Sequence, residues 1–511
     1  MADKFKYTFD TNYDSRQIGA LSSASLQSQI DENGEALSPS HTPVERAPLE
    51  PGLSFQSGIT PPQNRRLNQC SAVIGVSLLI FPLHAALALS SLLYAVFFVL
   101  VVWRGFLVMV GICAQVSHRN TGHERGRRRQ HPTYSIMIPV YREAGIMAQI
   151  ARAMSDLNWP ADKLDLQILL ETDDAETIAA AQAASFPPNT RLTLVPEGGP
   201  RTKPNALNYG LTRARGEYVT VYDAEDLPHP DQLQAAFNAF EHISRTTVCL
   251  QCPLVADNGG SSWLSAQWAL EYDVQFGLLL PGLATYRMPL LIGGTSNHFR
   301  KSALLALGGW DAWNVTEDAD LGIRIARAGL STGTINIPTY EDAPTRFGIW
   351  YSQRSRWIKG HMQTWFVLMR DPHKALRQLG FAGFVTSQMT LGGAILAPLF
   401  FLPCAMLVLV LSVLGELGSL YGLSLIPIAL GVGLIGDLAA PGPWSHHRLI
   451  AASTRWLYWP LHSLAAFRAI WELANKPFFW AKTPHQPRRA EATQSCSTGS
   501  SAFPLQHALS D

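Results

Sequence analysis

The sequence predicts an α/β domain with a mostly parallel sheet and transmembrane helices on both sides of it. Between residues 130 and 345, short apolar strands alternate with stretches of helical composition. This alternation is typical of a parallel sheet covered by helices. On either side of that stretch the chain turns apolar over lengths that suit membrane spans.

Composition supports a membrane protein and argues against a nucleic-acid partner. Only 15% of the 511 residues are charged, against roughly 25% in a soluble domain. The formal net charge is +1, so no basic surface is expected to attract nucleic acid. Cys249 and Cys252 form the one CxxC of the sequence, but residues three apart on a strand point to opposite faces, which argues against a zinc site.

Three apolar segments are the predicted strands, and polar residues follow each of them. The strands are expected at 134–140, 166–170 and 218–222, with helices near 148–157 and 178–184. In such sheets, ligands bind at the carboxyl ends of the strands. The sequence therefore predicts a binding site where these polar residues meet.

The N-terminal part divides into a tail and a hairpin. Residues 1–64 are polar, carry no cleavable signal and are predicted to be disordered. Residues 70–116 are too long for one span and predict a hairpin of two transmembrane helices, with basic residues placing both ends at the cytoplasmic side. Arg104 lies within the second span. Either this span ends early and Arg104 reaches the interface, or Arg104 faces a polar channel.

The C-terminal part predicts further membrane elements. Residues 346–380 read as an interfacial segment, and 381–440 as two transmembrane helices. The apolar-aromatic stretch 447–485 carries several charges, which favours an interfacial helix over a span. Four spans in total are expected, with five as the alternative. Residues 486–511 are predicted to be a disordered tail.

Asp223-Ala224-Glu225-Asp226 follows the third predicted strand. On extended backbone, side chains two residues apart share one face, so Asp223 and Glu225 could grip a divalent ion that bridges a diphosphate. The alternative is an acid-rich turn ahead of two prolines.

Two later motifs bear on catalysis. Thr316-Glu317-Asp318 precedes a predicted helix, where acids also occur merely to complement the helix dipole. The run 353–357 carries Arg356, whose donor fork suits a diphosphate, and Trp357, whose face suits a sugar ring. The alternative is a plain interfacial helix, in which Arg and Trp are common.

The order of these motifs resembles that of the processive membrane glycosyltransferases of family 2, which include cellulose, hyaluronan and chitin synthases. The resemblance covers roughly residues 70–485 and rests on the acids after the second strand, the DxD-like acids, the Thr-Glu-Asp tripeptide and the spacing of Gln353, Arg356 and Trp357 ahead of apolar helices. It implies a cytoplasmic, nucleotide-sugar-binding GT-A type domain. The implied reaction is inverting transfer from a UDP-sugar to a growing β-linked polysaccharide, exported through the enzyme's own helices.

The resemblance also implies roles for individual residues. Asp318 would be the general base, and Asp223 with Glu225 would hold Mg²⁺ or Mn²⁺. Glu225 departs from the family's aspartate, and Asp226 is its alternative. Asp173, or Asp174 beside it, would contact the donor base. The remaining predicted substrate-binding residues are Lys203, Glu317, Gln353, Arg356 and Trp357.

Location and partners follow from the same resemblance. It implies a multi-pass protein of the inner (plasma) membrane, with a UDP-sugar, a polysaccharide acceptor and the bilayer as partners, and it allows for a periplasmic export partner. Residues 479–484 resemble the family's gating segment in composition but not in order. Two alternatives remain: single-sugar transfer to a lipid carrier, and a catalytically degenerate membrane-anchored assembly subunit.

Overall fold

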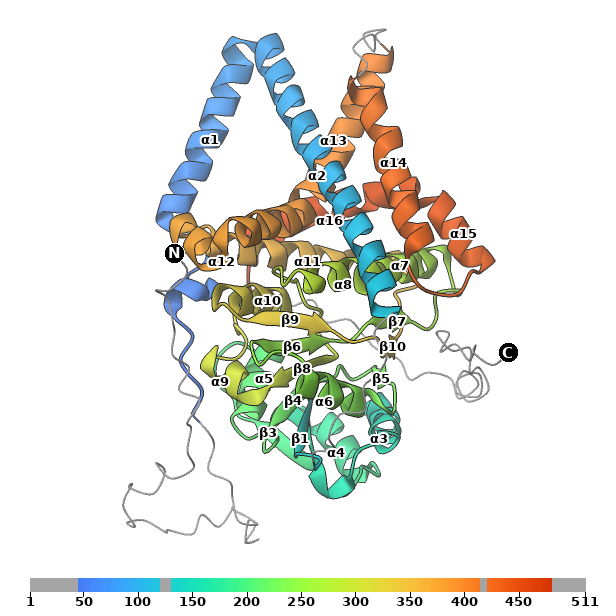
Figure 1. Cartoon of the computed structure of the whole chain (residues 1–511). Helices are drawn as coiled ribbons and strands as arrows, with labels where there is room; N and C mark the ends of the chain where they lie inside the picture. Colours follow the sequence, from blue (N-terminus) through green and yellow to red (C-terminus); the bar gives the residue numbers. More distant parts are fainter. Residues whose placement is uncertain (1–44, 120–129, 414–420, 480–511) are drawn as a thin grey trace, which may run out of the picture. The chain divides into compact units, whose positions relative to one another are not determined.

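The computed structural model describes residues 45–119, 130–413 and 421–479 (Figure 1). Its main sheet has seven strands in the order β3-β2-β1-β4-β8-β6-β9. β8 is antiparallel to β4 and β6, and all other neighbours are parallel. The predicted mostly parallel sheet is therefore confirmed. The strands are β1 (Tyr134–Val140), β2 (Leu164–Glu171), β3 (Arg191–Val195), β4 (Tyr218–Val221), β6 (Thr247–Gln251), β8 (Asn297–Arg300) and β9 (Ser331–Thr334).

A second, small sheet crosses the carboxyl edge of the first. It contains β5 (Leu227–Pro228), β10 (Thr339–Glu341) and β7 (Leu254–Ala256), with β10 in the middle. β10 pairs antiparallel with β5 and parallel with β7. This pairing brings Glu341 close to the acids that follow β4.

Helices cover the main sheet because each presents an apolar stripe to it. In α3, for example, Met147, Ile150 and Met154 are buried against the strands. The helices of this domain are α3 (Met147–Ser155), α4 (Ala175–Ala183), α5 (Lys203–Leu211), α6 (Gln232–His242), α7 (Trp263–Val274), α8 (Leu280–Thr285), α9 (Lys301–Ala306) and α10 (Glu317–Arg327).

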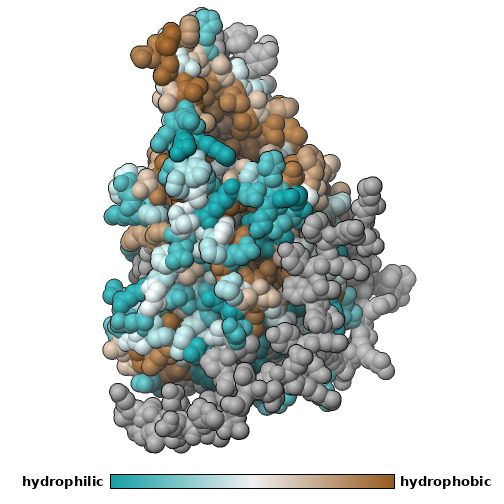
Figure 2. Space-filling model, turned by 90° about the vertical axis from the view of Figure 1, so that its left-hand side faces the viewer, coloured by the Kyte–Doolittle hydropathy of each residue, from teal (hydrophilic) through white to brown (hydrophobic). Residues whose placement is uncertain are grey.

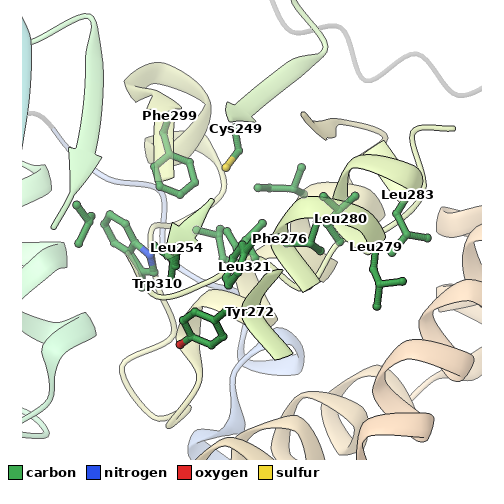
Figure 3. Close-up of a cluster of buried hydrophobic side chains, with 14 of the residues drawn as sticks. Cys249, Leu254, Tyr272, Phe276, Leu279, Leu280, Leu283, Phe299, Trp310 and Leu321 are labelled. Atoms are coloured by element: carbon green, nitrogen blue, oxygen red, sulfur yellow. The ribbon is translucent and has the colours of Figure 1, made fainter. Parts of the chain in front are cut away.

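A continuous apolar core joins the sheet to the long helices. Figure 3 shows one buried cluster, with Cys249 and Phe299 of the sheet at one side, Phe276 between, and Leu279 and Leu280 at the other side. On the far side, Gly111 of α2 (Pro82–Arg119) packs against the backbone of Leu278, so closely that a Cβ at Gly111 would clash. This contact holds the segment that carries Leu278 close to α2.

A layer of helices separates the sheet domain from the long apolar helices (Figure 1). The layer consists of α11 (Phe347–Leu368), α12 (Pro372–Ser387), α15 (His446–Ser453) and α16 (Arg455–Asn475). Beyond it extend α1 (Pro61–Ile80), α2, α13 (Gly393–Val413) and α14 (Tyr421–Ala439). The predicted interfacial segments thus appear as helices that lie between the two regions.

Two helices in the described residues are long and apolar enough to cross a membrane, by length and composition. The first is Ala88–Gln115, within α2. The second is Pro372–Met406, which runs from the start of α12 into α13. Pro427–Ala439, in α14, is a shorter apolar helix. The predicted hairpin at 70–116 exists as two helices, but the first half of α1 is polar and α1 does not reach this standard. Figure 2 shows apolar side chains gathered at the end of the molecule that carries the long helices.

Residues 45–64 are ordered, so a disordered tail does not extend to residue 64 as predicted. Phe55 is buried, and Ser54 donates its hydroxyl to Asp311 at 2.8 Å. Arg370 donates to several backbone carbonyls of this segment. Since these partners lie far along the chain, the polar local sequence gave no sign of them. The rest of the predicted tail, the C-terminal tail and residues 480–485 lie outside the described residues.

Candidate active site

One cavity of about 1640 Å³ connects the carboxyl edge of the sheet with the long helices. Its walls come from the strand ends, from α11 and from α2, α13, α14 and α16. Eight of the nine predicted site residues line it, and the ninth, Asp173, does not. The eight are Lys203, Asp223, Glu225, Glu317, Asp318, Gln353, Arg356 and Trp357.

The acids after β4 reach the cavity through a turn. β4 ends at Val221, so the predicted extended backbone beneath Asp223 and Glu225 is wrong. The turn is closed by Asp226, whose Oδ2 accepts hydrogen bonds from the Asp223 amide at 2.8 Å and from the Thr295 hydroxyl. Asp226 is buried and does not line the cavity, whereas Glu225 does. Of the two candidates, Glu225 is therefore the one that faces the cavity.

Negative charge is concentrated at this end of the cavity. Burial raises the pKa of Glu225 well above its ordinary value, and the carboxylates of Asp223, Asp226 and Glu341 raise it further. Glu341 was not predicted as a site residue. It arrives through the pairing of β10 in the small sheet, and no spacing in the sequence indicates that pairing.

Lys203 links the two groups of acids. It is the first residue of α5, and its Nζ donates to the Asp223 carboxylate and to the Gly294 carbonyl, the latter at 2.8 Å. Burial disfavours its charged form, but the carboxylates of Asp223 and Glu317 outweigh burial and raise the pKa of Lys203. Lys203 therefore supplies a fixed positive charge inside the cavity.

Asp318 lies near Lys203 as well, and its charge acts on that lysine. It belongs to the first turn of α10, and its Oδ1 accepts the Ala319 amide at 2.8 Å. A Cβ on Gly294 would stand 3.1 Å from Asp318 Oδ2 and 3.6 Å from Lys203 Nζ. Glycine at 294 therefore lets the side chains of Asp318 and Lys203 approach the backbone closely. Burial raises the pKa of Asp318. Burial, followed by the Asp318 charge, raises the pKa of Glu317 to about 8.

Gln353, Arg356 and Trp357 face the cavity from α11. Arg356 donates to the carbonyl of Val315 at 3.3 Å, so its guanidinium lies beside the loop that leads into Glu317 and Asp318. The Trp357 ring lies 4.9 Å from that of Trp268 and is stacked at 6.4 Å with that of Tyr272. One part of the indole still faces the cavity, since Trp357 is only partly buried.

Arg354, which the motif leaves unassigned, holds Trp357 in place. Its guanidinium is buried, lies 4.7 Å from the Trp357 ring and forms two hydrogen bonds to Glu271, at 2.8 and 2.6 Å. Burial acts to raise the pKa of Glu271, but the Arg354 charge outweighs it and lowers the pKa to about 2. Arg354 therefore lines the cavity beside Trp357 with its charge paired to Glu271.

Of the two aspartates after β2, Asp174 has a structural role and Asp173 lies near the cavity. Asp174 is buried, caps α4 by accepting the Thr177 amide at 3.3 Å, and also accepts the amide of Arg142. Asp173 instead pairs with Arg201 at 2.5 Å. Because Arg201 lines the cavity and Asp173 does not, Asp173 lies at the rim.

Arg104 faces the cavity from α2. Of the two alternatives for this residue, the structure shows the one in which its side chain points inward and not toward an interface. Near it on α14, Asp437 is held by Arg455 through two hydrogen bonds of 2.7 Å.

No group of three or more His, Cys, Asp or Glu side chains that could hold a metal ion is found in residues 45–119, 130–413 and 421–479. The predicted pair Asp223 and Glu225 thus offers two protein ligands and no third.

A mixed, mostly parallel sheet with acids at its carboxyl edge and a cationic wall opposite them suits an enzyme of nucleotide-sugar transfer. Residues 218–436 match the model of the Glycosyl transferase family group 2. Over these residues the chain is therefore similar to the glycosyltransferases of family 2.

Known proteins resemble the chain over about half of its length. It is 25% identical to a beta-monoglucosyldiacylglycerol synthase of Synechocystis, over 51% of this chain and 55% of that protein. It is 26% identical to a cellulose synthase catalytic subunit of Komagataeibacter sucrofermentans, over 45% of this chain and 31% of that protein. Among solved structures, a mannosyltransferase from Pyrobaculum calidifontis aligns with a TM-score of 0.46 and 18% identity, over 75% of this chain and 99% of that one.

Proposed function

We propose that the protein is an inverting glycosyltransferase of the plasma membrane that transfers a sugar from a UDP-sugar to an acceptor held in the cavity. The observation that carries this proposal is the single cavity that Asp223, Lys203, Asp318 and Arg356 share and that continues between the long helices. Asp173, at the rim beside Arg201, would contact the donor base. The catalytic domain would face the cytoplasm.

Asp223 and Glu225 fit a divalent cation. Both present hard oxygen ligands to the cavity, and Asp226 and Glu341 add negative charge around them. Magnesium is commonly held by one or two carboxylates, with water and substrate phosphates completing its shell. Two protein ligands therefore suffice for Mg²⁺ or Mn²⁺. Such an ion would neutralise charge on the diphosphate.

The chain's own residues account for the transfer step. The Asp318 carboxylate takes the proton of the acceptor hydroxyl as that oxygen forms a bond to the anomeric carbon. The bond from that carbon to the phosphate oxygen breaks, and the nucleoside diphosphate leaves on the opposite face. Lys203 and Arg356 stabilise the charge that develops on it. Because burial raises the pKa of Asp318, its carboxylate is a stronger base than one in water.

Two kinds of acceptor are candidates. Trp357 exposes part of its ring to the cavity and could stack on an acceptor sugar, which supports extension of a β-linked polysaccharide and its export between the helices. The likeness to a cellulose synthase subunit supports the same acceptor. The likeness to a diacylglycerol-sugar synthase supports the second candidate, an acceptor attached to a lipid.

The test is release of UDP by the full-length protein in lipid nanodiscs, offered a panel of UDP-sugars with Mg²⁺ or Mn²⁺. Asp318→Asn should lower turnover by about 10²–10⁴-fold while leaving UDP affinity unchanged, because the base acts on the acceptor alone. Products are then sized and digested with linkage-specific hydrolases. Turnover undiminished in Asp318→Asn would remove that residue from the role. If no UDP is released with any of the donors, a catalytically degenerate assembly subunit is favoured.

A further inference from the structure

The part of the cavity between the long helices contains one cation whose charge is not balanced. Four arginines and three carboxylates line or adjoin it, and three pairs form among them. The pairs are Arg354–Glu271 at 2.6 Å, Arg455–Asp437 at 2.7 Å and Arg448–Asp273 at 2.9 Å. The fourth arginine is Arg104, and in the described part of the chain no hydrogen bond or ion pair joins it to a protein group.

Arg104 is placed to bind a ligand in this cavity. Arg104 lies within the apolar span Ala88–Gln115. Its side chain is nevertheless exposed, and it lines the cavity. Its electrostatic neighbours are Arg455, Asp437 and Glu271, of which both acids already have partners. An unpaired charge between membrane helices is costly, and such residues usually mark a ligand site. A guanidinium binds phosphate oxygens two at a time.

One wall of this part of the cavity suits a hydrocarbon chain, whereas the α2 and α16 walls include polar side chains such as Ser90 and His462. α13 and α14 contribute only apolar side chains and Cys404 to the cavity, apart from the paired Asp437. Leu425 and Leu430 come from α14, and Pro398 and Phe401 from α13. A polysaccharide would lay many hydroxyl groups against this wall and find few partners there. A polymer with repeated negative charges would need more than one free cation.

We propose that this part of the cavity binds a lipid with a phosphate head group, whose phosphate pairs with Arg104 and whose hydrocarbon chain lies against α13 and α14. The same cavity leads on to Asp318. The phosphate would therefore lie between the hydrocarbon chain of the lipid and the acceptor hydroxyl. The lipid would in this way carry the acceptor into the active site. This last step rests on the proposed function, and the lipid site itself does not.

The test measures equilibrium binding of radiolabelled farnesyl phosphate to the full-length protein in phosphatidylcholine nanodiscs, with empty nanodiscs subtracted. The wild type should bind it, and Arg104→Gln should weaken binding about 10- to 100-fold, as expected for hydrogen bonds to a charged group. Arg104→Lys should retain part of the affinity. Arg66→Gln is the matched control, because Arg66 is exposed on α1 and does not line the cavity. UDP affinity, measured on each variant, checks the fold.

Competition identifies the ligand class. Farnesol should compete poorly, and inorganic phosphate should compete only at far higher concentration, if both the head and the chain are recognised. Equal competition by inorganic phosphate would overturn the lipid and leave a phosphate site. Displacement by an oligouronate would overturn it in favour of an anionic polysaccharide. Equal binding by Arg104→Gln and the wild type, or no binding at all, would overturn the proposal altogether.

The two proposals can fail separately. If farnesyl phosphate binding depends on Arg104 but no UDP-sugar is turned over, the lipid site stands and the transferase assignment falls. If turnover depends on Asp318 but lipid binding does not depend on Arg104, the transferase assignment stands and the lipid site falls.

Discussion

The end of the cavity at the sheet and the end between the long helices differ in how their charged side chains are arranged. At the sheet, loops and strand ends bring several carboxylates together around one lysine, Lys203, which pairs with Asp223. Between the helices, charges occur as separate pairs, and α13 and α14 form an apolar wall. The comparison teaches that one cavity joins an end with many clustered charges to an end with few.

Loss of the pair Arg354 and Glu271, which lines the cavity, should have the largest effect on stability. Arg354→Ala removes the charged partner of Glu271, whose side chain is 27% exposed and keeps a hydrogen bond from the Tyr458 hydroxyl, so the cost should be about 3 kcal/mol. Unfolding of the detergent-solubilised protein measures this. Arg377→Ala is the control, since Arg377 is exposed on α12. A change no larger than that of the control would show that the two ends do not depend on this pair.

The same pair should make stability sensitive to acid. The folded-state pKa of Glu271, about 2, lies below its ordinary value of 4.5. Its contribution is therefore fully present above about pH 4.5 and is lost as the pH falls from there toward about 2. Melting temperatures between pH 6 and pH 3 should fall less steeply in Glu271→Gln than in the wild type. Parallel curves would assign acid sensitivity to other groups.

At the sheet end, Asp223 and Asp226 should behave differently although they are three residues apart. Asp223→Ala should weaken metal-dependent UDP binding by about tenfold or more, because a ligand to the cation is removed. Asp226→Asn should lower stability by about 1–3 kcal/mol, because it alters the turn, but binding should still respond to Mg²⁺. Calorimetric titration of UDP with and without metal separates the two. The reverse pattern would make Asp226 the ligand.

The smallest expected effects distinguish Asp173 from Asp174. Asp174→Ala removes a helix cap and should cost about 1 kcal/mol of stability. Asp173→Ala should leave stability unchanged and weaken UDP binding by a few fold, since Asp173 forms only an exposed pair with Arg201. Unchanged UDP affinity in Asp173→Ala would place the donor base elsewhere in the cavity.

Local patterns account for much of the fold. The strand and helix periods predicted β1, β2 and β4 within two residues at each end, and placed the helices that follow β1 and β2. The motifs in turn predicted eight residues that do line one cavity. These features are carried by neighbouring residues, where hydrophobic period and side-chain chemistry are visible directly.

Other features depend on contacts between distant segments. The turn at Asp223, the arrival of Glu341 on β10 and the packing of residues 45–60 against Asp311 and Arg370 all arise in this way. Sequence periodicity carries no information on which distant groups will pair.

By itself, then, the sequence determined the mostly parallel α/β domain, the apolar helices around it and the chemistry that its motifs can perform. Only the tertiary structure decided that Glu225 rather than Asp226 faces the cavity, and that Arg104 lines the cavity with no hydrogen bond or ion pair to another residue that the structure describes. The physical reason is that the composition of a segment fixes what its residues can do, whereas packing fixes which of them are left free to do it.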